Sequence, residues 1–108
     1  MSQVLELRQA LGITQQQLAH SLRTSVQTIS RWERQISDPG SMARERLDAL
    51  EELVRLAREV LDRGHVQEWF TAPNELLGGL EPLDAMRSPG GIEKVRDLLG
   101  RIKWGISA

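Results

Sequence analysis

The sequence predicts an all-α fold. Apolar residues recur at helical spacing along the chain, whereas the strict alternation of apolar and polar residues that marks a strand does not recur. Breaks that contain glycine or proline divide this pattern, and side chains suited to helix capping follow several of them. The breaks fall at Gly12, 38–40, Gly64, 78–79 and 88–91. These observations predict a series of helices joined by short turns.

The first two helices are predicted from their apolar faces and their ends. One face of the first helix carries Val4, Leu7 and Leu11. This helix should end at Gly12, because glycine tolerates the left-handed conformation in which helices often finish. Thr14 stands three residues before Gln17, a capping-box pattern in which each side chain bonds the other residue's backbone N–H. The second helix should begin here and bury Leu18, Ala19 and Leu22.

A third helix is expected after a break at 23–24, with Ser25 as its cap. Its buried side should consist of Trp32 together with Ile29 or Val26. A long fourth helix should follow Gly40, because apolar residues continue there at alternating spacings of four and three, which is a heptad pattern. The residues of this pattern are Ala43, Leu47, Leu50, Val54, Ala57 and Leu61.

The apolar face of the long helix is wider than the heptad pattern alone requires. Leu53, Leu56 and Val60 extend it. A single small module of three helices could not cover such a face, so the helix should pack on the C-terminal region, on a second subunit, or on both. The alternative is the central helix of a monomeric core.

Three further helices are predicted in the C-terminal region, each with its own start signal. Asn74 can cap a short helix that the glycines at 78–79 end, and Pro82 opens another. Ser88 and Pro89 supply the cap and the first-turn proline of a final helix. That helix carries Ile92, Val95, Leu98, Leu99 and Ile102. The paired glycines lack both the spacing and the preceding strand of a phosphate-binding loop, so nucleotide binding is not expected.

Composition excludes several classes of function. The 108 residues suffice for one ordinary domain or two very small ones that share a core. The chain lacks cysteine and tyrosine, and its two histidines lie far apart in the sequence. We therefore expect no metal site, no cofactor, no catalytic residue and no enzymatic activity. No apolar run approaches the roughly 20 residues of a membrane span and no signal peptide is evident, so a cytoplasmic location without membrane contact is expected.

The distribution of charge favours a polyanion as partner only at the N-terminal end. The formal net charge is -1, which argues against a generally basic nucleic-acid binder. Residues 1–40 contain four arginines and three acids, whereas residues 41–71 contain five arginines and seven acids. Any binding to nucleic acid must therefore arise from a local arrangement of charge.

The stretch LGITQQQLAHSLRTSVQTISRWERQISDPG, residues 11–40, resembles the helix-turn-helix of the phage-repressor (Xre) class. The shared features are the Thr-Gln opening of the second helix, the Leu-Ala pair at 18–19, the Thr-Ile-Ser-Arg-Trp-Glu run at 28–33 and the proline-containing exit. Arg23 departs from the pattern, since this class usually has glycine in the tight turn. Either a strained backbone at Arg23 or a slightly rebuilt turn is expected.

The resemblance implies that the third helix enters the major groove of operator DNA. By resemblance, Val26, Gln27 and Arg31 take base-facing positions, where they suit a thymine methyl group, adenine and guanine respectively. Gln15, Thr28 and Arg34 match phosphate-contacting positions. The alternative is a solvated surface helix on which Arg31 pairs with an acid. The expected DNA-binding residues are Gln15, Ser25, Val26, Gln27, Thr28, Ser30, Arg31 and Arg34.

A homodimer would suit this mode of binding. Repressor-type modules commonly bind paired half-sites about one turn of DNA apart, and one module with a modest positive field should bind weakly alone. The wide apolar face of the long helix is a candidate for the contact between subunits.

The segment VQEWFTAPNELLGGLEPLDAMRSPGGIEKVRDLLGRIKWGISA, residues 66–108, is similar to the toxin-binding domain of the MbcA/ParS/Xre antitoxin family. That pattern runs from an aromatic residue through Pro-Asn, Leu-Gly-Gly and Pro-Leu to a final helix. The matching residues are Trp69, Pro73, Asn74, Leu77, Gly78, Gly79, Pro82, Leu83, Val95, Leu99, Ile102 and Gly105.

This second resemblance implies a type II antitoxin. Its cognate toxin would have the RES fold and destroy NAD, and the C-terminal domain would cover the toxin's active site. The antitoxin would also regulate its own operon through operator DNA. The implied organisation is a helix-turn-helix module at 1–40, the connecting part of a long helix at 41–52 and a toxin-binding domain at 53–108. The expected toxin-binding residues are Ile102, Lys103, Trp104, Gly105 and Ile106.

Three alternatives remain open at this point. Trp104 could pack on its own domain and not enter the toxin. The chain could be a stand-alone repressor whose C-terminal domain dimerises or binds a small ligand. It could also be an interaction adaptor whose helix-turn-helix has lost affinity for DNA. A toxin encoded beside the chain and copurifying with it would favour the antitoxin.

Overall fold

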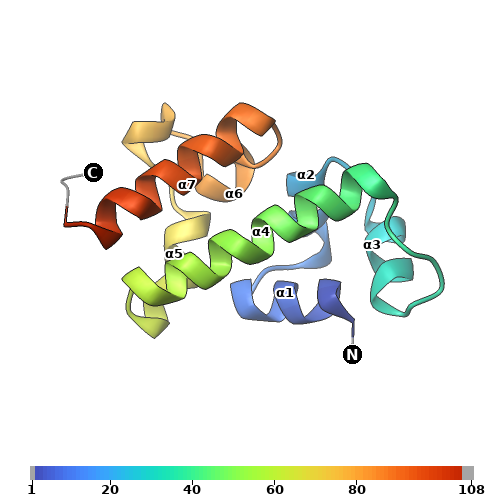
Figure 1. The fold of residues 1–108 in the computed structure, drawn as a ribbon. Helices are drawn as coiled ribbons and strands as arrows, with labels where there is room; N and C mark the ends of the chain where they lie inside the picture. The colour runs from blue at the N-terminus through green and yellow to red at the C-terminus, as the bar shows by residue number, and fades with distance from the viewer. Residues whose placement is uncertain (1, 106–108) are drawn as a thin grey trace.

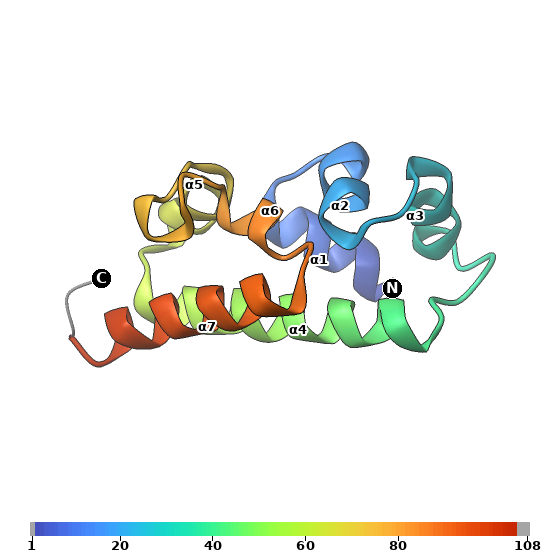
Figure 2. The same ribbon diagram turned by 90° about the horizontal axis from the view of Figure 1, so that it is seen from above.

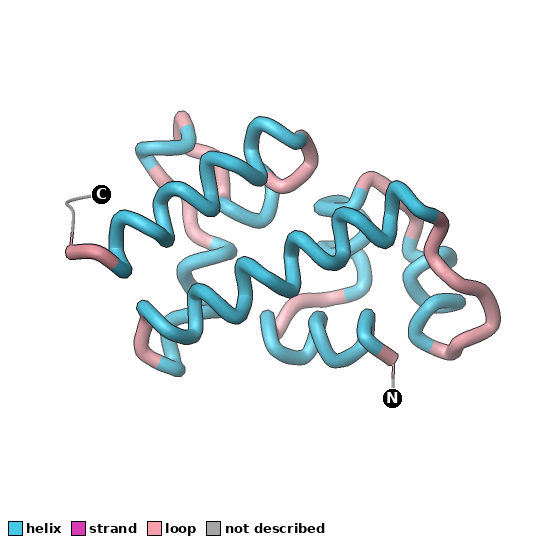
Figure 3. Tube along the Cα trace, in the orientation of Figure 1, coloured by secondary structure: helices cyan, strands magenta, loops and turns pink. Residues whose placement is uncertain are grey.

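The computed structural model describes residues 2–105, and all of its regular elements are helices (Figures 1 and 3). The all-α prediction is confirmed. None of the described helices is long and apolar enough to cross a membrane. The elements are α1 (Gln3–Leu11), α2 (Gln15–Leu22), α3 (Val26–Glu33), α4 (Ser41–Val60), the 3-10 helix η1 (Arg63–His65), α5 (Val66–Thr71), the 3-10 helix η2 (Glu75–Leu77), α6 (Pro82–Ala85) and α7 (Pro89–Lys103).

Two long helices form one layer of the molecule. Helices α4 and α7 lie side by side and run in the same direction, and the other helices cover one side of this pair (Figure 2). Two ion pairs join them: Arg96 Nε lies 3.0 Å from Glu52 Oε1, and Lys103 Nζ lies 3.3 Å from Glu59 Oε2. The chain is elongated, with extents of 43 × 25 × 21 Å. Helix α3 lies at one end with α2 next to it, and the C-terminal end of α7 lies at the other end (Figure 2).

The predicted helix starts are confirmed by their hydrogen bonds. The backbone N–H of Gln17 donates to Thr14 Oγ1 across 3.0 Å, and that of Thr14 donates to Gln17 Oε1 across 2.8 Å. The other predicted caps also bond the first turns of their helices: Ser25, Asn74 and Ser88. Local sequence was sufficient here because a cap involves residues within one turn of each other.

The turn between α2 and α3 retains the shape that glycine would favour. Arg23 adopts a left-handed conformation with φ 59° and ψ 46°. The following N–H, of Thr24, donates to the carbonyl oxygen of Ala19 across 2.9 Å. The predicted strain at Arg23 is therefore present, because its Cβ crowds the backbone in this conformation. A rebuilt turn is not needed.

Helix α4 is continuous and packs within the chain. Its buried residues pack toward α1, α2, α5 and α7: Leu47, Leu50, Leu53, Val54 and Ala57. The predicted contact with the C-terminal region is confirmed by its packing against α7. One continuous cluster of buried apolar residues extends from Val4 in α1 to Leu99 in α7. Packing on a second subunit stays a prediction.

Polar contacts also join the N-terminal and C-terminal helices. Ser21 Oγ on α2 donates to the carbonyl oxygen of Leu83 on α6 across 2.8 Å. The side-chain amide of Gln67 on α5 donates to the carbonyl oxygen of Gly12 across 2.9 Å. Helix α5 was not predicted from the sequence. It has only six residues and no side-chain cap, so the usual local start signal is missing.

Candidate DNA-binding and protein-binding surfaces

Helix α3 has two buried anchors and an exposed polar face. Ile29 and Trp32 are buried in the core. Val26 is 37% exposed, which shows that Ile29 and not Val26 supplies the buried side. The predicted base-facing residues Gln27 and Arg31 are exposed. The helix therefore buries one stripe and offers short polar groups and a long cation on the other, as a recognition helix requires.

The other predicted DNA-binding residues surround this face. Ser25 is the N-cap of α3, and its hydroxyl oxygen accepts from the backbone N–H of Thr28 across 3.1 Å. Thr28 and Ser30 are half-buried on α3. Arg34 is the C-cap residue and is exposed. Within residues 2–105, no acid lies within ion-pair distance of Arg31 or Arg34. Both cations are therefore available to a polyanion.

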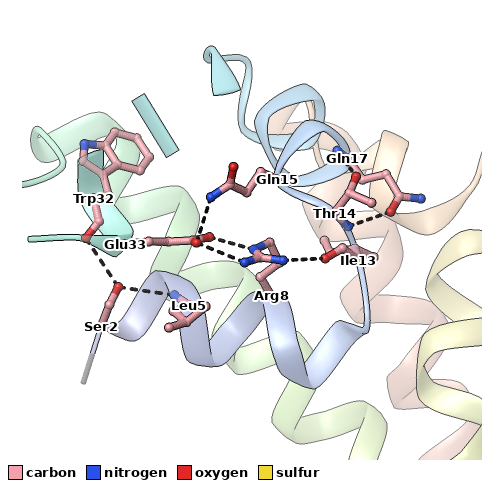
Figure 4. Close-up of polar contacts among 9 residues, drawn as sticks. All are labelled: Ser2, Leu5, Arg8, Ile13, Thr14, Gln15, Gln17, Trp32 and Glu33. Carbon is pink, nitrogen blue, oxygen red and sulfur yellow. Dashed lines mark hydrogen bonds and ion pairs between the residues drawn. The ribbon is translucent and has the colours of Figure 1, made fainter. Parts of the chain in front are cut away.

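Gln15 bonds α3 at Glu33, which also forms a partly buried ion pair with Arg8 (Figure 4). Arg8 on α1 donates to Glu33 on α3 at two points, with Nε to Oε2 at 2.7 Å and Nη2 to Oε1 at 3.0 Å. The Gln15 amide nitrogen donates to the same Glu33 Oε1 across 3.0 Å. The Glu33 side chain is only 7% exposed. The network thus fixes the N-terminal end of α2 against the C-terminal end of α3.

The ion pair favours the charged form of Glu33. The hydrogen bond from Arg8 lowers the pKa of the Glu33 carboxyl, burial opposes this change, and the hydrogen bond from Gln15 adds to the lowering. The same hydrogen bond raises the pKa of Arg8. The pairing was not predicted from the sequence, because the two residues are separated by 25 positions and only the packing of α1 on α3 brings them together.

A second hydrogen-bonded contact, made to the backbone of α3, also orients this helix (Figure 4). Ser2 Oγ accepts from the N–H of Leu5 across 3.3 Å as the N-cap of α1. The same hydroxyl donates to the carbonyl oxygen of Trp32 across 3.4 Å. Because Ser2 and Trp32 are both buried, this contact fixes the angle between α1 and α3. The position of the exposed face of α3 is thus determined by α1 as well as by α2.

The predicted toxin-binding residues lie at the C-terminal end of α7. Ile102 is half-buried, and Lys103 pairs with Glu59 on α4. Trp104 is the C-cap residue and is 76% exposed, so it does not pack on its own domain. Gly105 has φ +73°. Ile106 lies outside the described residues. An exposed tryptophan is a large apolar group available to a partner.

Another exposed apolar group lies around η2. Leu76 and Leu80 are 52% and 51% exposed, whereas Leu77 between them is buried. The exposure of these two leucines was not predicted from the sequence. Three of the five residues at 76–80 are leucines, and the sequence does not reveal which of them face solvent. The 3-10 conformation of η2 and its closure by Asn74 determine it.

This chain is similar to known proteins over both the candidate DNA-binding surface and the candidate protein-binding surface. Residues 4–41 match the family model for helix-turn-helix domains, and residues 56–105 match the family model described as the antitoxin Xre/MbcA/ParS C-terminal toxin-binding domain. The mycobacterial cidal antitoxins MbcA of Mycobacterium bovis and Mycobacterium tuberculosis are each 27% identical over 96 residues, which is 89% of this chain and 84% of theirs. A chain in the crystal structure of the M. tuberculosis MbcT–MbcA toxin–antitoxin complex superposes with a TM-score of 0.80 at 26% identity, covering 99% of this chain and 96% of that one.

Proposed function

We propose that this chain is an antitoxin that neutralises a cognate toxin and binds operator DNA. It joins a helix-turn-helix domain to an Xre/MbcA/ParS C-terminal domain, and it is homologous to the Xre-type antitoxin MbcA. The observation that carries the proposal is the likeness over 99% of the chain to a component of a toxin–antitoxin complex. Neutralisation by covering the toxin requires a rigid surface and no catalysis by this chain.

The toxin is proposed to have the RES fold and to degrade NAD, as the resemblance of residues 66–108 implies. The exposed Trp104 supports a contact that fills the entrance of the toxin's active site. Lys103 precedes Trp104 in the chain, and its ammonium group, now paired with Glu59 at an exposed position, is proposed to exchange that partner for a pocket built for an anionic substrate. The toxin-binding residues are proposed to be Ile102 to Gly105, together with Ile106.

The DNA-binding half is proposed to regulate the operon. Arg31 and Arg34 are exposed cations without an acid partner in the described structure, and Gln15 is held next to α3 by Glu33. The proposed organisation is a helix-turn-helix module at 1–40, a connecting helix at 41–52 and a toxin-binding domain at 53–108. A homodimer would place two copies of α3 on paired half-sites in the cytoplasm.

The decisive experiment is an assay of NAD consumption by the protein encoded beside this gene, with and without the purified chain. We expect inhibition close to a 1:1 molar ratio. Trp104→Ala should weaken inhibition and leave operator binding intact, whereas Arg31→Ala should have the opposite effect. Unchanged NAD consumption with the chain in excess would favour a stand-alone repressor instead.

A further inference from the structure

The leucines around η2 are held outward by a closed loop. The side-chain oxygen of Asn74 accepts from the N–H of Leu76 across 2.9 Å. The N–H of Asn74 donates to the carbonyl oxygen of Leu80 across 3.0 Å, and that of Gly79 donates to the carbonyl oxygen of Asn74 across 3.0 Å. Leu77 anchors the loop in the core. Leu76 and Leu80 therefore face solvent because the backbone fixes them there.

All of the charged residues around this loop in the sequence are acidic. Residues 66–86 contain four acids and no lysine or arginine. Of these acids, Asp84 lies 3.5 Å from His20 Nε2. Within the described residues the other three form no ion pair: Glu68, Glu75 and Glu81. Glu75, which is exposed, directly precedes Leu76, and the half-buried Glu81 directly follows Leu80, so acidic residues border the two exposed leucines along the chain.

This border limits the choice of partner. DNA is a polyanion and would be repelled by it, and the loop lies away from α3 in both views (Figures 1 and 2). A symmetric contact between two copies through this loop would bring the acids of one copy near the acids of the other, which like-charge repulsion disfavours. The charge pattern fits a different protein that offers an apolar depression with a basic border.

We propose that the loop at 74–80 is a second toxin-binding element, in which Leu76 and Leu80 enter an apolar depression of the toxin bordered by lysine or arginine. The inference rests on the proposed function, because the partner is the cognate toxin. The loop lies within the region that matches the toxin-binding family model, toward the same end of the molecule as the C-terminal end of α7. The two elements together form a wider contact than the α7 end alone.

The test measures the affinity of the full-length chain for the toxin encoded beside it, by titration calorimetry. The double variant Leu76→Gln/Leu80→Gln should bind at least about tenfold more weakly than wild type, since apolar anchors at the centre of an interface carry much of its affinity. The variant Glu75→Gln/Glu81→Gln should bind more weakly at low salt, and its affinity should depend less on salt concentration than that of wild type. Operator binding by both variants should equal that of wild type, which shows that they are folded.

The matched control is Ile36→Gln/Met42→Gln, since these apolar residues are 62% and 71% exposed near the other end of the chain. It should leave the affinity for the toxin unchanged. If the wild-type chain binds the toxin and the leucine variant binds it equally well, the second toxin-binding element is overturned and the proposed function stands. An equal loss in the control variant would also overturn it, because the effect would not be specific to the loop. A wild-type chain that does not bind the toxin would overturn both.

Discussion

The hydroxyl of Ser21 on α2 donates a hydrogen bond to the carbonyl oxygen of Leu83 on α6 across 2.8 Å, in a position fully shielded from solvent. The two residues are separated by 62 positions and belong to the parts of the chain that carry the two proposed activities. Because the surrounding apolar core is also continuous, we expect the helix-turn-helix and the C-terminal helices to unfold together.

Replacing Ser21 by alanine should lower the free energy of unfolding by about 1–3 kcal/mol, because the Leu83 carbonyl would be left buried without its partner. The measurement is urea denaturation followed by circular dichroism, with a single transition expected for both proteins. Ser37→Ala is the matched control, since Ser37 is exposed in the loop after α3. Equal midpoints for Ser21→Ala and wild type would contradict the prediction.

The Arg8–Glu33 ion pair should make stability depend on pH in the acid range. The pKa of Glu33 in the folded chain lies below its ordinary value of about 4.5, mainly through the hydrogen bond from Arg8. The stabilisation is therefore complete above about pH 4.5 and is lost as the pH falls through the lower pKa of the folded state.

Glu33→Gln removes this titration. We expect the variant to be less stable than wild type at pH 7, since Arg8 would be left without its counter-ion. The difference should shrink as the pH is lowered from 5 to about 3, measured as unfolding free energy in urea at each pH. A constant difference over this range would show that the carboxyl of Glu33 does not titrate as proposed.

Arg31 and Arg34 should contribute differently to operator binding. Arg31→Ala should remove about 1–3 kcal/mol of discrimination between operator and unrelated DNA, because a base contact carries sequence information. Arg34→Ala should weaken binding to both DNAs equally and lower the slope of log K against log salt by about one, since a phosphate contact releases counter-ions. Fluorescence anisotropy at several salt concentrations measures both quantities.

The control for these variants is Arg58→Ala, because Arg58 is exposed on the last turn of α4, away from α3. It should leave the affinity for the operator and the salt slope unchanged. Loss of sequence discrimination in Arg34→Ala but not in Arg31→Ala would exchange the two proposed roles.

Adjacent glycines in α7 should respond in opposite directions to alanine. A Cβ on Gly91 would lie 1.8 Å from the carbonyl oxygen of Ala85, whereas a Cβ on Gly90 would have no atom within 4 Å. Gly91→Ala should therefore force α6 and α7 apart and cost about 2 kcal/mol or more of stability. Gly90→Ala should raise stability by up to about 1 kcal/mol, since alanine is the better helix former. Thermal unfolding of the two variants beside wild type measures this contrast, and destabilisation of equal size in both would contradict it.

The sequence alone determined the features that depend on neighbours within one or two turns. The capping box of Thr14 and Gln17, the glycine end of α1 and the buried positions of α4 follow from side-chain chemistry and helical periodicity. The strain at Arg23 was one of the two outcomes expected from the sequence, because the tight turn places there a residue that is usually glycine. These features account for the all-α fold and for the polar face of α3.

Only the tertiary structure decided which distant groups meet. The ion pair of Arg8 with Glu33 and the hydrogen bond of Ser21 with Leu83 depend on how helices pack, and periodicity does not specify the partner of a polar side chain far along the chain. The outward positions of Leu76 and Leu80 combine both kinds of contact: the hydrogen bonds of Asn74 set the shape of the loop, and the burial of Leu77 against the core sets its orientation. Local chemistry thus determined where the helices begin and end. Because all the apolar faces pack into one core, the tertiary structure determined which side chains remain exposed to bind a partner.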